Sequence, residues 1–157
     1  MKIHRLSQCA ILLSCGLFLV GPARADNCSG YDVLVNQSSE TTDVGKGQTL
    51  TVVRNWSMIV NDDTKARDHL VVGECNGTFL SLPNGQSKGS GFCERRDKDG
   101  DTYSLEWAIA PGAEKGTWKG LTGTGKFARE ANNSGWWQSA ATDGRVFATR
   151  RGGNCNW

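Results

Sequence analysis

The chain has 157 residues, of which 38% are hydrophobic and 22% charged, and its formal net charge at pH 7 is +2. Three of the basic residues (Lys2, Arg5 and Arg24) precede the first acidic residue, Asp26, and the rest of the chain carries 15 basic against 16 acidic residues. A chain without a basic surplus lacks the electrostatic basis for binding nucleic acid or an anionic membrane surface. The length suits one domain.

The first 25 residues have the features of a secretory signal peptide. A basic start is followed by a short apolar run, Cys9–Val20, and by Ala23-Arg24-Ala25, the small-x-small pattern that signal peptidase cleaves. The apolar run is shorter than the roughly 20 residues that span a bilayer. We expect cleavage after Ala25, which leaves residues 26–157 as a single periplasmic or secreted domain with no integral membrane segment.

Four cysteines remain after such cleavage, which are Cys28, Cys75, Cys93 and Cys155. In an exported domain they indicate two disulfides, for which three pairings exist. Cys75–Cys93, across a turn rich in Gly and Pro, and Cys28–Cys155, near the two ends, form the favoured pairing. In the chain-entropy model these loops contribute about 3 and about 5 kcal/mol. A four-cysteine zinc site needs closely spaced Cys pairs, which are absent. We therefore predict no metal and no cofactor.

The remaining sequence predicts an all-β domain. Helical spacing of apolar residues is absent, and alternation of period two recurs between clusters of Gly, Thr, Asn and Ser. About eight or nine short strands at this spacing are typical of a sandwich or a closed barrel, and closure removes exposed edges. The expected strands are Tyr31–Asn36, Thr49–Asn61, His69–Cys75, Thr78–Leu82, Gly89–Arg96, Thr102–Ile109, Gly116–Leu121, Gly135–Ala140 and Arg145–Arg150.

Alternation also predicts which side chains share a face. Trp107 shares a face with other apolar residues of Thr102–Ile109, while Arg54 and Glu74 are charges that stand in otherwise apolar rows. If those rows face inward the two charges pair, because buried charges need partners; the alternative is exposure at strand ends. The six Trp residues suit either a filled core or an aromatic-lined cavity. The candidate ligand-binding residues are Arg54, Trp56, Glu74 and Trp107.

Two motifs resemble known sites but lack essential positions. Asp97-Lys98-Asp99-Gly100-Asp101 resembles the start of a calcium loop, but strands flank it and Asp99-Gly100 is a hairpin signal. We interpret it as a structural turn with weak cation binding as an addition. Gly120–Phe127 matches a phosphate-binding loop until Phe127, where Ser or Thr is required. Its glycines are better explained by tight turns.

Nucleophilic catalysis has little support in the sequence. After cleavage the only histidine is His69, no GxSxG motif occurs, and all four cysteines are better used as disulfides. A lone histidine is usually a surface or hydrogen-bonded residue. Carboxylate pairs are numerous, and the sequence does not show which of them face each other.

Five segments together resemble a known family. The order Gly91-Phe-Cys93, Asp97–Asp101, Glu106-Trp107, Gly116-Thr-Trp118 and Gly123–Phe127 is similar to that of small exported bacterial proteins of the allene oxide cyclase and dirigent type of β-barrel. The resemblance covers about Cys75 to Trp137. It implies an eight-stranded antiparallel, calycin-like barrel in which GTGKF forms a corner between late strands. It also implies binding of apolar, reactive intermediates and assembly into a homo-oligomer.

The continuation after GTGKF departs from the family. Related proteins continue with a second glycine-rich step, whereas this chain has Ala128–Gly135, and no catalytic residue of the plant cyclases matches a position here. Fold transfers more safely than activity. We therefore expect a non-enzymatic exported barrel that binds a small apolar ligand or an envelope partner. The alternative is a cyclase or isomerase acting inside the barrel, and a third hypothesis is a secreted inhibitor acting through its surface loops. A cavity of roughly several hundred Å³ that contains Arg54 or Glu74 favours the first two. A barrel solidly filled by Trp, Leu and Val favours a surface-acting protein.

Overall fold

The computed structural model describes residues 26–157, which form one antiparallel sheet and two short 3-10 helices. The predicted signal peptide, residues 1–25, lies outside the described residues. The strands are β1 (Asp26–Asn27), β2 (Gly30–Gly45), β3 (Gln48–Asn61), β4 (Val72–Ser81), β5 (Ser87–Arg96), β6 (Thr102–Ile109), β7 (Gly116–Gly123), β8 (Ser134–Asp143) and β9 (Val146–Cys155). The helices η1 (Gly125–Phe127) and η2 (Glu130–Asn132) lie between β7 and β8. Neither helix in this part of the chain has the length and apolar character that crossing a membrane requires.

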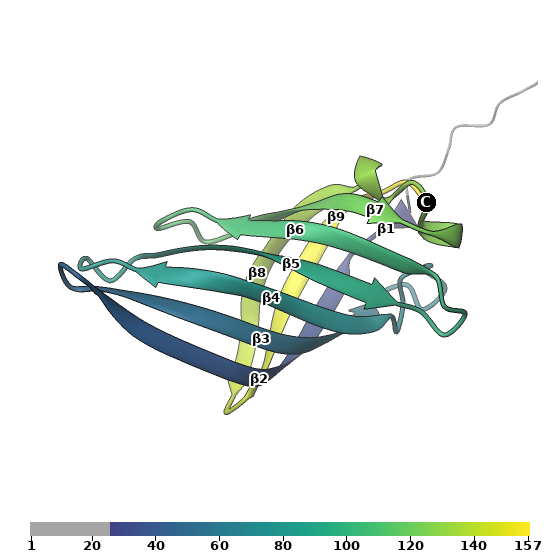
Figure 1. The fold of residues 1–157 in the computed structure, drawn as a ribbon. Coiled ribbons are helices and arrows are strands. Elements are labelled where there is room, and N and C mark those ends of the chain that lie inside the picture. Colours follow the sequence, from purple (N-terminus) through teal and green to yellow (C-terminus); the bar gives the residue numbers. More distant parts are fainter. Residues whose placement is uncertain (1–25) are drawn as a thin grey trace, which may run out of the picture.

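Strands β2 to β9 close into a barrel (Figure 1). Each of these strands pairs in antiparallel fashion with the next one along the chain, and β9 also pairs with β2, which closes the ring. The two residues of β1 extend the pairing at the end of β9. Closure gives every long strand two neighbours, which protects most of the sheet edge, while β2 from Ser38 to Gly45 pairs with β3 alone. The prediction of an all-β, eight-stranded antiparallel barrel is confirmed.

An aromatic cluster fills one end of the barrel. It consists of Tyr103 on β6, Phe127 on η1 and Trp157 at the C-terminus, with ring centroids 4.8 to 5.8 Å apart. All three side chains are buried. Figure 1 shows the two short helices at this end, beside β7 and the C-terminus. The glycine-rich GTGKF corner thus turns the chain and inserts Phe127 as part of the plug.

Both predicted disulfides are present. Cys28–Cys155 joins the chain just before β2 to the end of β9, and Cys75–Cys93 joins directly paired positions of β4 and β5. Their Cα atoms are 5.8 and 4.0 Å apart. All four cysteines are buried inside the barrel. The favoured pairing is therefore confirmed.

Strand β4 differs from the sequence-based expectation. The sequence predicts separate strands at His69–Cys75 and Thr78–Leu82, whereas one strand runs from Val72 to Ser81. The residues before it form a turn in which Leu70 has a φ of 61°. Asn76 and Gly77, which resemble a break in the strand, continue the ladder opposite β5. Gly77 serves side-chain packing at this position, because the ring of Trp107 lies against it.

Candidate ligand-binding cavity

The barrel contains a cavity between its centre and one of its ends. At this end short turns join β2 to β3, β4 to β5, β6 to β7 and β8 to β9. The space open to the centre of a water-sized sphere is about 100 Å³, and the total space between atoms, including the open mouth, is about 660 Å³. All eight long strands contribute to the lining, and most of it is apolar. Its aromatic residues are Phe79, Trp107, Trp118, Trp137 and Phe147. The barrel is thus neither solidly filled nor a wide pore.

Glycines explain why the large indole rings leave space inside. A methyl group at Gly77 or Gly91 would lie 2.3 or 2.6 Å from Cζ2 of Trp107, so this ring lies flat over the backbone of β4 and β5. The ring of Trp118 lies over Gly135 in the same way. A side chain at these glycines would push the rings into the lumen, because barrel interiors are closely packed. The glycines therefore keep the aromatic side chains against the wall.

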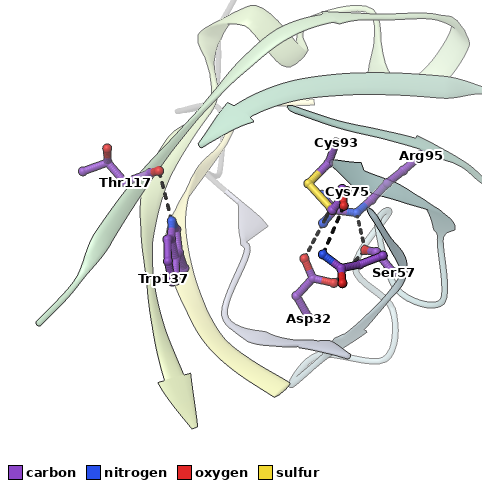
Figure 2. Close-up of a disulfide and its surroundings, with 8 residues drawn as sticks. Asp32, Ser57, Cys75, Cys93, Arg95, Thr117 and Trp137 are labelled. Carbon is purple, nitrogen blue, oxygen red and sulfur yellow. Dashed lines mark hydrogen bonds and ion pairs between the residues drawn. A yellow bond between two sulfur atoms is a disulfide. The ribbon is translucent and has the colours of Figure 1, made fainter. Parts of the chain in front are cut away.

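The rings near the mouth of the cavity pack against one another. The ring of Trp107 lies 5.9 Å from that of Trp137 in an edge-to-face arrangement and 5.3 Å from that of Phe79. Nε1 of Trp137 donates a hydrogen bond to the backbone carbonyl of Thr117, 3.2 Å away (Figure 2). This bond fixes the orientation of the indole on the barrel wall. Aromatic pairs of this geometry gain energy beyond the area that they bury.

A buried ion pair forms the polar floor of the cavity. Nη2 of Arg95 pairs with Oδ2 of Asp32, and Nε of Arg95 donates to Oγ of Ser57, 3.0 Å away. Ser57 in turn donates to Oδ1 of Asp32 at 2.7 Å, which closes a ring of three side chains (Figure 2). Nη2 of Arg95 also contacts Sγ of Cys75 at 3.2 Å. Because Arg95 is 2% exposed, its charge depends on Asp32 for compensation.

A second ion pair lies deeper in the barrel. Nη2 of Arg151 is 2.6 Å from Oδ2 of Asp68, and Nε of Arg151 donates to the carbonyl of Cys28. Nδ2 of Asn61 donates to the other carboxylate oxygen of Asp68. Burial is the largest influence on the pKa of Arg151 and lowers it, but the charges of Asp68, Tyr103 and Asp32 and the hydrogen bond to Asp68 together outweigh burial, so the net shift is upward. Each buried guanidinium therefore has one carboxylate, and the polar floor is close to neutral.

The closed end contains a buried acid that the sequence does not single out. Glu130 on η2 is 1% exposed, and its Oε2 accepts a hydrogen bond from Nδ2 of Asn133 at 2.7 Å. Burial raises the pKa of Glu130 to about 7, despite this hydrogen bond. Burial likewise raises the pKa of Tyr103 to about 12. This end of the barrel thus holds an acid that titrates near neutral pH.

Of the four residues predicted to bind ligand, only Trp107 lines the cavity. Arg54, Trp56 and Glu74 lie on the outer wall, where Trp56 is 47% exposed and pairs across strands with Glu74. Arg54 and Glu74 form no ion pair in the described structure. Of the two alternatives, these residues follow the exposed one, because the inner row of β3 is the other one and contains Asn55 and Ser57. A role for them in ligand binding stays untested.

The residues that sequence reasoning missed are the charged ones inside. Asp32, Arg95 and Arg151 each occupy an inward position of a strand. The sequence could have indicated this, because an even number of residues separates the arginines from a cysteine on the same strand. Arg95 is two residues from Cys93 and Arg151 is four from Cys155, and alternate residues of a strand share a face. By the same rule Glu74, which adjoins Cys75, belongs outside.

The two incomplete motifs interact with each other. Oδ1 of Asp97 accepts hydrogen bonds from the backbone N–H groups of Asp99 and Asp101, and its Oδ2 lies 2.5 Å from Nζ of Lys126. Oδ2 of Asp101 accepts a hydrogen bond from the backbone N–H of Lys126. The lysine of the GTGKF segment therefore binds the Asp97–Asp101 turn. Both motifs serve to fasten η1 to the β5–β6 hairpin.

The other candidate metal ligands and the histidine have structural partners. Two groups of potential ligands occur in the described residues, and each combines one aspartate with two cysteines that form a disulfide. Disulfide sulfurs are not thiolate ligands. His69 lies in the turn before β4, and its Nδ1 accepts a hydrogen bond from the backbone N–H of Asn61 at 3.2 Å. His69 is thus a hydrogen-bonded residue, as the sequence suggests for a lone histidine.

Comparisons with solved structures support the fold. A β-barrel-like protein from Acinetobacter baumannii AYE matches with a TM-score of 0.60 and 8% identity, over 86% of this chain and 99% of its own. An enzyme from Penicillium herquei matches with a TM-score of 0.58 and 12% identity, over 83% and 97%. A pterocarpan synthase dirigent protein matches with a TM-score of 0.50 and 11% identity, over 98% and 97%. The chain shares their β-barrel fold.

The comparisons reach no further than the fold. No protein-family model matches the sequence, and no curated protein is similar to it. At 8 to 12% identity, the structural matches carry no information about activity. The resemblance to dirigent-type barrels is thus confirmed for the architecture alone.

Proposed function

We propose that this protein is exported and binds a small, mainly apolar molecule inside its barrel, without catalysing a reaction. The observation that carries the proposal is the cavity itself, which aromatic rings line on the sides and a neutralised polar cluster closes at the base. Small-molecule sites in proteins are typically concave and mostly apolar, with a few fixed polar groups. A protein that acted only through its surface would have no need of such an interior.

The way in which the cavity is built supports a binding role. Five glycines lie under the rings of Trp107, Trp118 and Trp137, and glycines weaken strands in which they serve no purpose. A core selected for stability alone would fill the lumen with aliphatic side chains to native density. Retaining space beside rigid aromatic side chains costs packing energy, which bound ligand restores.

Export fits the covalent structure. Both disulfides are buried and complete, and disulfides form and persist in oxidising compartments such as the periplasm or the extracellular space. The predicted signal peptide at residues 1–25 is consistent with this location. These features support the proposal of a periplasmic or secreted location.

A cyclase or isomerase acting in the same cavity is the second candidate. The favouring observation is the ionisable pair Asp32–Arg95 at the polar floor of the cavity. Such a reaction needs mainly a shaped apolar cavity and one or two polar groups to orient the substrate. An enzyme would release a product isomeric with its substrate, whereas a binding protein would return the ligand unchanged.

Native mass spectrometry of the protein from its producing host tests the proposal. Leu34 lines the cavity, and its neighbour Val35 is 43% exposed on the outer wall. We expect a small molecule to accompany the wild-type protein and Val35→Trp, but not Leu34→Trp, which fills the lumen. Retention by both variants would place the ligand elsewhere. Empty wild-type protein would favour recognition through the surface instead, and an isomerised ligand would favour the enzyme.

A further inference from the structure

We propose that the ligand of this cavity is a neutral carbonyl compound, whose oxygen accepts hydrogen bonds from the guanidinium groups on the cavity floor. The proposal rests on the proposed function, since it concerns the polar end of the same cavity. It adds the chemical class of the ligand, an aromatic or alicyclic ketone, quinone or lactone. Three features of the floor carry it: its free donors, its occupied acceptors and its charge balance.

The floor holds hydrogen-bond donors that have no acceptor. Arg95 lines the cavity, and its Nε and Nη2 have partners, whereas its buried Nη1 has none. Arg151 also lines the floor, and its Nη1 donates to no described residue. The hydroxyl of Thr149, which pairs across strands with Asp32, forms no hydrogen bond within the described chain either. Buried donors are nearly always paired in proteins, so the buried Nη1 of Arg95 in particular points to an acceptor that the ligand supplies.

Each carboxylate oxygen of the floor, in contrast, already accepts a hydrogen bond. The two oxygens of Asp32 accept hydrogen bonds from Ser57 and Arg95. The two oxygens of Asp68 accept hydrogen bonds from Asn61 and Arg151. A ligand amine or ammonium group would therefore have to share an oxygen that already accepts a hydrogen bond, whereas Nη1 of Arg95 has no partner. The arrangement favours a ligand whose polar end accepts hydrogen bonds and does not need to donate them.

Charge balance distinguishes a neutral acceptor from an anion. Arg95 and Arg151 carry two positive charges, and Asp32 and Asp68 carry two negative ones. A carboxylate ligand would add an uncompensated negative charge to a buried site, which is unfavourable without a further cation. A carbonyl oxygen adds none, and it still receives the strengthened hydrogen bond that a guanidinium donates. The floor therefore suits a ketone better than a carboxylate.

NMR titration with three probes of similar size tests this inference. The probes are ethylbenzene, acetophenone and benzoate, added to isotope-labelled protein with both disulfides formed, and the indole N–H signals of Trp107 and Trp137 report binding. Arg95→Lys keeps a positive charge beside Asp32 but removes the guanidinium, and Thr149→Val removes only the hydroxyl. Thr78→Val, exposed on the outer wall, is the matched control.

The decisive quantity is the ratio of the Kd of ethylbenzene to the Kd of acetophenone. It compares the two probes within one protein, so differences in cavity shape between variants largely cancel. We expect the ratio to fall about tenfold in Arg95→Lys and about twofold to threefold in Thr149→Val, as the loss of a charged and a neutral hydrogen bond implies. It should stay unchanged in Thr78→Val. Benzoate should bind more weakly than acetophenone.

The outcomes separate this inference from the proposed function. If ethylbenzene and acetophenone both shift the indole signals and the ratio is the same in Arg95→Lys and Thr149→Val, the carbonyl inference is wrong and the binding function stands. Tighter binding of benzoate than of acetophenone would overturn the choice of a neutral ligand. If no probe shifts the signals of the folded protein, the binding function itself is contradicted.

Discussion

Stability should fall as pH rises toward neutrality because of Glu130. Burial raises the pKa of this side chain to about 7 from an ordinary value of 4.5, although the hydrogen bond from Asn133 and the charges of Arg151 and Arg95 favour its ionised form. The carboxylate of Asp68 acts in the same direction as burial. Between pH 4.5 and about 7, the folded protein therefore binds this proton more tightly than the unfolded chain. The stabilising contribution is complete below pH 4.5 and is lost as pH rises through 7.

The size of the effect follows from the shift. A difference of roughly 2.5 pKa units corresponds to about 3 kcal/mol in the free energy of unfolding. Other carboxylates also titrate, so the effect is best measured against Glu130→Gln, which keeps a neutral side chain at this position. We expect the stability of the wild type relative to Glu130→Gln to fall by about 3 kcal/mol between pH 4.5 and 8.

Urea unfolding at several pH values measures this difference. The m-value must stay constant for the comparison to hold. Glu106→Gln, exposed on the outer face of β6, is the control and should show no comparable trend. A wild-type to Glu130→Gln difference that stays flat across this range would refute the reasoning, because it would mean that Glu130 is ionised in the folded protein as readily as in the unfolded chain.

Three further predictions concern the barrel itself, and each is measured by equilibrium unfolding. Asp32→Ala should lower the free energy of unfolding by about 3 to 5 kcal/mol, because it leaves the charge of Arg95 buried and uncompensated. Asp62→Ala, in an exposed ion pair, should lower it by less than about 1 kcal/mol. Equal losses in the two variants would contradict the burial argument. Gly77→Ala should lower the free energy of unfolding by about 1 to 3 kcal/mol, since the added methyl group overlaps the indole ring of Trp107. An unchanged free energy would show that this ring moves freely. Removing Cys28–Cys155, with a sequence separation of 127, should lower the free energy of unfolding by about 2 kcal/mol more than removing Cys75–Cys93, with a separation of 18. A larger loss on removal of Cys75–Cys93 would count against the chain-entropy explanation.

The sequence was sufficient for the architecture because alternation and disulfides are local or nearly local signals. The period-two pattern of Thr102–Ile109 correctly placed Tyr103, Leu105 and Trp107 on one face, and that face is the inner one. The signal failed where a strand has apolar residues on both faces. On β3, the outer row of Trp56 and Met58 is more apolar than the inner row, so hydrophobicity alone selects the wrong face.

The interior of the barrel was harder to predict because its polar residues lie on different strands. Asp32, Arg95 and Arg151 meet only after the ring has closed, through pairings that span most of the chain. No local pattern distinguishes them from surface charges. The cysteines show which alternate residues face inward, since a buried disulfide marks the inner face of each strand that it joins.

The packing of tryptophan over glycine also exceeds what the sequence shows directly. Gly77 falls between two expected strands and Gly91 inside a third, yet both are strand residues beneath the ring of Trp107. Only the register of β4, β5 and β6 reveals this. The same register decides whether six tryptophans fill a core or line a cavity, which the sequence left open.

The measurement that tests the central claim most directly is a crystal structure of the protein soaked with bromobenzene, in which the anomalous signal of bromine locates the apolar probe. Binding inside the barrel predicts a bromine peak in the cavity between Trp107, Trp137 and Phe147. An empty interior, with bromine only on the outer wall beside exposed residues such as Trp56 and Phe92, would contradict the claim that the barrel binds its ligand inside.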